Sequence, residues 1–417
     1  MTSRPGAEGP AQAPEPPQAL DGLRVLDLSG HMGNYCGKLF AELGADVILV
    51  EPPHGSPLRR EPPFADDVEG PERSLPFLYN NTSKRSVCLD LEQASDRETL
   101  RRLAGVAGLI IETDKPGAMA ARGLGYQELS AHNPGLVMTS ITPFGQTGPY
   151  AHYQASDLVC LALGGLLSLG GYADGPPVQA AQQQAYAAGN LYGAVASMLA
   201  LTSADATGQG QHVDVSVQEC VVMAMENAAQ FQDLEGRTRR RTGGQQMRAG
   251  SGVFSCADGH VYMLAGGIGG NRFWANLVKW LTSEGVAQAD RLRGPVWADR
   301  GYLESEPAHQ LFAEIFLPFS AGQSKADLYR DAQRWRVPLC PVNSPGDILQ
   351  HRQLRDRGYF VETAGLPGTP GDAVLMPGAP YRLSETPWRL RSRAPRLGEH
   401  TDEVLRELDQ AAVEEVS

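Results

Sequence analysis

The pattern of apolar and polar positions along the chain predicts short strands that alternate with helices. Residues 22–28 and 46–51 are apolar runs typical of buried strands. Between them, residues 31–45 carry apolar side chains at helical spacing, and Gly44 marks the end of that helix. A strand, a helix and a strand within about thirty residues form a βαβ unit with parallel pairing. The first part of the chain therefore predicts an α/β fold.

The same alternation continues further along the chain. An amphipathic helix over 95–107 precedes a buried strand over 108–112, and further strands are expected at 136–141 and 210–217. Loops that follow such strands, including Thr113-Asp114-Lys115, lie where open parallel sheets bind their ligands. Lys115 therefore suits an anionic ligand, although a solvated surface charge explains it equally well, as it does Lys84 and Arg85.

Changes in composition predict the domain organisation. Residues 1–19 are rich in Pro, Ala and Glu and are expected to form a disordered tail. Residues 20–235 are expected to form the first part of a large domain. Residues 236–335 begin with an arginine-rich linker, continue into a hairpin with Asp258-Gly259 at its turn, and are expected to form a smaller domain. Residues 336–417 are expected to return to the large domain.

The net charge and the positions of the cysteines argue against several classes of function. The 417 residues carry a net charge of −12, which disfavours a nucleic-acid or anionic-membrane surface. The six cysteines lie far apart with no CxxC, which predicts reduced thiols and no metal site. No apolar segment follows a basic start, so no signal peptide is expected, and the most apolar run, 158–171, is shorter than the ~18 residues of a spanning helix. We therefore expect a cytoplasmic protein. A nicotinamide-binding site is disfavoured because Gly30 and Gly33 do not form a GxGxxG motif.

Ten fragments occur in one order along the chain. They are LDGLRVLDLS, ELGADVILVEPP, SKRSVCLDL, KPGAMAARGLG, ITPFGQTGPY, DGPP, TGQGQHVDVSVQE, DGHVYM, VPLCPV and LGEHTDEVL. Together they resemble the class III CoA-transferases of the CaiB/BaiF type, the family of formyl-CoA transferase, the carnitine CoA-transferases and α-methylacyl-CoA racemase. The resemblance covers the chain from about Leu20 to its end.

The resemblance implies a Rossmann-like large domain, a smaller α+β domain and an interlocked-ring dimer. It also implies that CoA and acyl-CoA serve as substrates, with no permanently bound cofactor, in carboxylic acid catabolism. In the family an aspartate attacks the acyl-CoA thioester to form a mixed anhydride, and the released thiolate then gives an aspartyl-CoA thioester. A carboxylate suits this role because it is ionised, and therefore nucleophilic, at pH 7.

The family's aspartate position falls on Tyr186 in this chain. A phenol with a reference pKa of ~10 is protonated at pH 7 and cannot follow the anhydride cycle. A shift in the correspondence would place Asp157 or Asp174 there instead, although both lie well before the expected position. Racemases of the family pair the aspartate with a histidine, and that position holds Ser156. Two-base racemisation is therefore disfavoured.

The resemblance also implies where CoA binds. The family's contacts fall on three loops and on an arginine that corresponds to Arg122, displaced by about one position. The loop residues are His31, Met32 and Gly33; Leu89, Asp90 and Leu91; and Thr113, Asp114 and Lys115.

Two interpretations account for a member without the aspartate. The chain is either the non-catalytic subunit of a hetero-oligomeric CoA-transferase, whose homologous sister subunit keeps the aspartate, or a homodimeric acyl-CoA-binding pseudoenzyme, isomerase or lyase. The first is favoured because ten retained fragments indicate that the scaffold is still used. The expected ligands are an acyl-CoA and a small carboxylic acid. A scaffold protein without CoA affinity is the alternative from another class.

Overall fold

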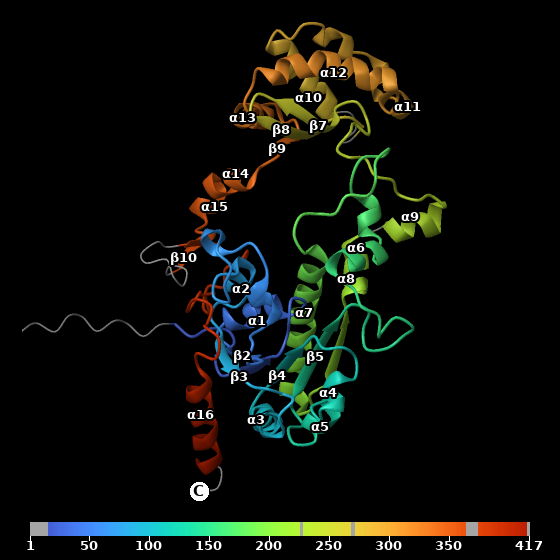
Figure 1. Cartoon of the computed structure of the whole chain (residues 1–417). Coiled ribbons are helices and arrows are strands. Elements are labelled where there is room, and N and C mark those ends of the chain that lie inside the picture. Colours follow the sequence, from blue (N-terminus) through green and yellow to red (C-terminus); the bar gives the residue numbers. More distant parts are fainter. Residues whose placement is uncertain (1–15, 226–227, 268–271, 364–373, 415–417) are drawn as a thin grey trace, which may run out of the picture. The chain divides into compact units, whose positions relative to one another are not determined.

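The computed structural model describes residues 16–225, 228–267, 272–363 and 374–414. The chain divides into two compact units, coloured along the sequence in Figure 1. Unit 1 takes in Met1–Gly165, Ala181–Glu226 and Asp356–Ser417, and unit 2 takes in Leu166–Ala180 and Asn227–Arg355. Most of the expected tail lies outside the described residues. Gln18, however, is buried and donates to the carbonyl of Glu42 (3.1 Å), so the ordered chain begins before Leu20.

Unit 1 is built on a six-stranded parallel sheet in the order β3-β2-β1-β4-β5-β6, which confirms the predicted α/β class. The apolar runs form its central strands because both faces of the sheet are covered. The strands are β1 (Arg24–Asp27), β2 (Asp46–Glu51), β3 (Arg85–Cys88), β4 (Leu109–Glu112), β5 (Val137–Thr142) and β6 (His212–Ser216).

Helices cover the two faces of this sheet in different ways. On one face a hydrophobic core joins the sheet to α3 (Ala94–Gly105), α4 (Ala118–Ala121), α5 (Tyr126–Ser130) and α16 (Thr401–Glu414). On the other face lie α1 (Asn34–Ala41) and α7 (Gln184–Thr207). α7 approaches the sheet closely because its buried face is made of small residues. A Cβ atom on Gly193 would lie 2.7 Å from the Ile141 side chain.

Shorter elements complete unit 1. α6 (Asp157–Leu163) and α8 (Val217–Ala224) pack beside α7, and α2 (Leu75–Asn80) packs near α1. After the chain returns from unit 2, β10 (Phe360–Thr363) and β11 (Val374–Pro377) form a two-stranded antiparallel sheet.

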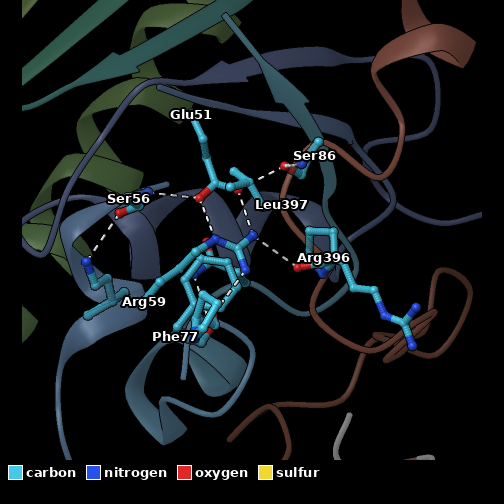
Figure 2. A network of polar contacts seen from close by, with 12 residues as sticks. Glu51, Ser56, Arg59, Phe77, Ser86, Arg396 and Leu397 are labelled. Carbon is cyan, nitrogen blue, oxygen red and sulfur yellow. Dashed lines mark hydrogen bonds and ion pairs between the residues drawn. The ribbon is translucent and has the colours of Figure 1, made fainter. Parts of the chain in front are cut away.

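A buried ion pair fixes the C-terminal segment to the end of β2 (Figure 2). The guanidinium of Arg59 donates to both carboxylate oxygens of Glu51 (2.6 and 2.7 Å) and to the carbonyl of Pro395 (3.1 Å). It also lies over the Phe77 ring, 3.8 Å from the centroid. Ser86 donates to the same Glu51 carboxylate (2.8 Å). Segments more than 300 residues apart therefore meet around one charge pair.

A second buried ion pair, between Lys84 and Asp27, lies against α1. The ammonium of Lys84 donates to Asp27 (2.7 Å), to the carbonyl of Asn34 (2.7 Å) and to Asn81 (2.8 Å). All three N–H groups are thus paired, which is what a fully buried ammonium requires. The interpretation of Lys84 as a solvated charge is therefore wrong. Arg85 is half-buried and pairs with Asp46 and Glu407.

Unit 2 contains a three-stranded antiparallel sheet in the order β7-β8-β9 with helices against it. The predicted hairpin is confirmed, although Ala257-Asp258 form its turn and Gly259 begins the second strand. The elements are α9 (Ala228–Glu235), β7 (Ser251–Cys256), β8 (Gly259–Leu264), α10 (Arg272–Ser283), α11 (Arg300–Leu303), α12 (Glu306–Ala321), α13 (Lys325–Trp335), β9 (Leu339–Pro341), α14 (Pro345–Gln350) and α15 (Arg352–Asp356).

The predicted return to the large domain at residue 336 comes too early. β9 pairs with β8, so this segment completes the sheet of unit 2, and the chain rejoins unit 1 at Asp356. The arginine-rich segment is also partly fixed. Arg241 donates to the carbonyls of Ser168, Tyr172 and Gly175, and the guanidinium of Arg239 lies over the ring of Phe231. These contacts give both side chains a structural role.

Candidate functional site

The strand order of unit 1 reverses between β1 and β4, and the loops after these strands lie beside each other. The backbone N–H of Gly30 donates to the Thr113 hydroxyl (2.8 Å), which joins the two loops directly. A Cβ atom on Gly33 would come within 3.0 Å of Thr113, so glycine permits this close approach. Open α/β sheets bind ligands at such a switch point. Three expected loop residues, Gly33, Thr113 and the neighbouring Met32, therefore belong to one edge of the sheet.

Charged side chains connect the remaining predicted positions. Arg122 donates to Asp114 (2.7 Å) and to Glu92 (3.1 Å), which directly follows Leu91. The loop after β3, the loop after β4 and Arg122 are thus brought together. Leu89 differs from the others, because its side chain is buried in the core and only its backbone is left to contact a ligand. Asp90 accepts from the backbone N–H of Glu92 (3.1 Å) and so shapes its own loop.

A cavity of about 580 Å³ opens in unit 1 around the first turn of α7. Tyr186 and His31 both line it. Burial, together with the nearby Cys160 and Asp157, raises the pKa of Tyr186 from 10.0 to about 12. The phenol is therefore protonated at neutral pH and is a poor nucleophile toward a thioester.

Asp157 lies beside Tyr186 in the fold but has a different role. It is 6% exposed, and its Oδ1 accepts from the backbone N–H of Tyr186 (3.0 Å). This is the favourable position of an anion at a helix N-terminus. Asp174, the other carboxylate considered, belongs to unit 2. Of the described residues that line the cavity, Glu61 alone carries a carboxylate.

Glu61 and His31 lie next to each other in the cavity wall. Nε2 of His31 lies 3.3 Å from Oε1 of Glu61. Close by, the rings of Tyr35 and Tyr79 stack at 6.1 Å, and the ammonium of Lys38 lies 4.6 Å from the Tyr79 centroid. The cavity thus combines one acid–base pair with an aromatic wall.

A second cavity, of about 370 Å³, lies at the ends of β4 and β5 and is lined partly by Lys115. The Ser140 hydroxyl lies 2.8 Å from Nε2 of His212 and hydrogen-bonds to Glu112. The carboxylate of Glu112 also accepts from the N–H of Asp114 (2.6 Å). Burial raises the pKa of Glu112 to about 7. The Glu112 carboxyl, which titrates near neutral pH, therefore hydrogen-bonds to the loop that is predicted to bind CoA.

The raised pKa of Glu112 predicts that the free energy of unfolding depends on pH. The folded protein binds the Glu112 proton more tightly than the unfolded chain, so stability falls as pH rises from about 4.5 to about 7. Between pH 5 and pH 8 the loss amounts to about 2–3 kcal/mol at most. Denaturant unfolding at the two pH values should show a smaller loss for Glu112→Gln than for the unchanged protein. The exposed Glu128→Gln, on the same cavity, should behave like the unchanged protein, and equal pH dependence in all three would contradict the assignment.

Two further searches concern the described residues only. No described helix combines the length and apolar character needed to cross a bilayer. Within the described ranges, no group of three or more His, Cys, Asp or Glu side chains is placed to hold a metal ion.

Comparison with known proteins identifies the family. Residues 20–401 match CoA-transferase family III, and the chain belongs to this family. It is 43% identical over 399 residues to the succinyl-CoA:(R)-benzylsuccinate CoA-transferase subunit BbsE of Thauera aromatica, covering 95% of this chain and 96% of the relative. It is 30% identical to the succinyl-CoA–L-malate CoA-transferase alpha subunit of Chloroflexus aurantiacus, covering 99% and 95%. The crystal structure of a CaiB/BaiF family protein from Brucella suis superposes with a TM-score of 0.80 at 30% identity, covering 94% and 100%.

The predicted resemblance to the class III CoA-transferases is therefore confirmed. The chain is a CoA-transferase polypeptide, and both named relatives are subunits. Glu61, Tyr35 and Tyr79 were not predicted as site residues, because no local motif marks them. Glu112 carried a weak signal as a charged residue that ends an otherwise apolar strand.

Proposed function

We propose that this chain is the non-catalytic subunit of a hetero-oligomeric CoA-transferase that moves CoA between carboxylic acids. The observation that carries the proposal is that Tyr186 lines the cavity, because the family resemblance assigns the nucleophilic aspartate to this position. A homologous sister subunit would supply the aspartate for the anhydride and thioester steps. By likeness to the Thauera subunit, succinyl-CoA and (R)-benzylsuccinate are the donor and acceptor to assay first.

An apolar face on α7 supports a protein partner. Leu191, Tyr192, Val195 and Leu199 are all exposed on this long helix, and three of them recur at a spacing of four residues. Monomeric proteins seldom expose a continuous apolar stripe of this kind. We call these four residues the α7 face. Leu191 also lines the Tyr186 cavity, so a partner seated on the α7 face would border that cavity. The family's interlocked rings would provide this arrangement.

The proposal also places CoA. The loops after β1, β3 and β4 would hold it with His31, Met32 and Gly33, with the backbone of Leu89, Asp90 and Leu91, and with Thr113, Asp114, Lys115 and Arg122. Backbone amides and the two cations Lys115 and Arg122 suit the phosphates of CoA. Arg122 would exchange its present carboxylate partners for phosphate oxygens.

The second candidate function is a homodimeric acyl-CoA-binding pseudoenzyme, isomerase or lyase. The pair His31 and Glu61 favours it, because an imidazole and a carboxylate 3.3 Å apart in a cavity are suited to proton transfer. Its reaction would need no nucleophilic carboxylate at position 186.

Reconstitution separates the two candidates. The chain alone and the chain co-expressed with its sister subunit are assayed for transfer from succinyl-CoA to (R)-benzylsuccinate, and their native masses are measured. The proposal expects transfer by the mixed complex alone, and loss of transfer when the sister's aspartate becomes asparagine. Transfer by a homodimer of this chain would contradict it, and Glu61→Gln would then test the remaining carboxylate.

A further inference from the structure

The Tyr186 cavity contains very little charge. Among the described residues that line it, Glu61 and His31 are the ionisable groups other than tyrosine, and they lie 3.3 Å apart. The Glu61 side chain lines the cavity and is 45% exposed, so it is accessible to a ligand. Neither lysine nor arginine belongs to this lining. A carboxylate that enters the cavity would therefore lie near the Glu61 carboxylate, and no lysine or arginine of the lining would balance its charge.

The nearby polar groups are largely engaged already. Asn190 uses its amide N–H on the carbonyl of Tyr186 (2.7 Å) and its oxygen on the N–H of Cys36 (2.7 Å). The hydroxyls of Tyr35 and Tyr79 hydrogen-bond to each other. Lys38 lies against the Tyr79 ring and donates to Glu42 and Thr82. None of these groups therefore offers an unpaired positive charge to an incoming anion.

The rest of the wall combines apolar and aromatic groups with the neutral amides of Asn80, Gln182, Gln183 and Gln184, so it carries no positive charge. Besides the stacked tyrosines, the lining includes Leu75, Leu191 and three prolines. Such a surface binds a hydrocarbon group by removing it from water. A free carboxylate placed there would lose hydration without gaining a charged partner, and it would be repelled by Glu61.

We propose that this cavity accepts the acyl group of a CoA thioester when that group is an uncharged aryl or alkyl chain, and that Glu61 excludes acyl groups with a free carboxylate. The proposal rests on the proposed function for the presence of CoA at the neighbouring loops. The exclusion of free carboxylates by Glu61 also affects how the mixed complex distributes its substrates. A dicarboxylic acyl-CoA is kept out of the subunit that cannot process it and remains available to the sister's aspartate.

The test measures thioester binding to the mixed complex by calorimetry. The two probes are 3-phenylpropionyl-CoA, whose acyl group is uncharged, and succinyl-CoA, whose acyl group ends in a carboxylate. The unchanged complex should bind one more equivalent of 3-phenylpropionyl-CoA than of succinyl-CoA. Glu61→Gln should strengthen succinyl-CoA binding at this additional site at least tenfold and leave 3-phenylpropionyl-CoA unaffected, which also shows that the variant is folded.

Glu69→Gln is the matched control, because Glu69 is an exposed carboxylate on the same segment outside the cavity lining. It should leave both stoichiometries unchanged. Equal binding of the two thioesters by the unchanged complex, absence of the additional site, or no response to Glu61→Gln would each overturn the proposal. The transfer assay reports on the proposed function separately, since a complex can transfer CoA through the sister's aspartate whichever thioester this cavity prefers.

Discussion

Arg59→Met is expected to lower the free energy of unfolding by about 3–5 kcal/mol, the usual cost of removing one partner of a buried ion pair. The Arg59 side chain is 1% exposed and the Glu51 side chain is fully buried. Methionine fills much of the space but leaves the Glu51 carboxylate with hydrogen bonds from Ser86 and the Ser56 N–H and no cation. The C-terminal segment would also lose its hydrogen bond through Pro395. Denaturant unfolding of the purified chain measures the loss.

The neighbouring Arg60 gives a matched control. Its side chain is exposed and makes one 3.3 Å contact, to the carbonyl of His54. Arg60→Met should change the unfolding free energy by less than about 0.5 kcal/mol. A Glu51→Leu, Arg59→Met double variant should recover part of the loss, because it removes both buried charges. Equal effects of the Arg59 and Arg60 variants would show that the buried pair contributes little.

Val195→Glu is expected to weaken assembly with the sister subunit by at least about 100-fold, or about 3 kcal/mol, and to abolish transfer at working concentrations. Val195 is 59% exposed in the chain and lies in the middle of the α7 face. A partner seated there would bury the new carboxylate without a counter-charge, which is strongly unfavourable. Native mass spectrometry of the co-expressed subunits measures the complex directly.

Val106→Glu makes the same exchange at a site away from the α7 face. Val106 is 40% exposed and follows the last turn of α3. This variant should assemble and transfer CoA like the unchanged complex. If Val195→Glu also assembles normally, the α7 face is not where the partner binds, and the apolar stripe needs another explanation.

The sequence was sufficient to predict much of unit 1. Its strands are short apolar runs separated by helical periodicity, and such local patterns predict α/β order directly. The limits of unit 2 were harder, because β9 is three residues long and its place is fixed by pairing with β8 about eighty residues earlier. No periodicity within residues 337–342 distinguishes that pairing from a return to the large sheet.

The same contrast holds for the site. The loops that contain Gly33 and Thr113 could be assigned to one ligand site, because the ends of parallel strands meet at one edge of a sheet. Lys84 was open to two interpretations because its partner Asp27 lies 57 residues away, and a lysine beside an arginine resembles a surface charge. Glu61 could not be predicted, since its role depends on the distant His31 and Tyr186. The assignment of Tyr186 to the family's nucleophile position stays a prediction, made from one changed position within an otherwise retained segment.

The central claim is that the covalent steps take place on the sister subunit. Trapping the intermediate tests this most directly. The mixed complex is incubated with succinyl-CoA, treated with hydroxylamine, which converts an activated carboxyl to a hydroxamate, and analysed by peptide mass spectrometry. The account predicts a hydroxamate on the sister's aspartate and none on peptides of this chain. A hydroxamate on this chain, at Glu61 or any other carboxylate, would contradict it.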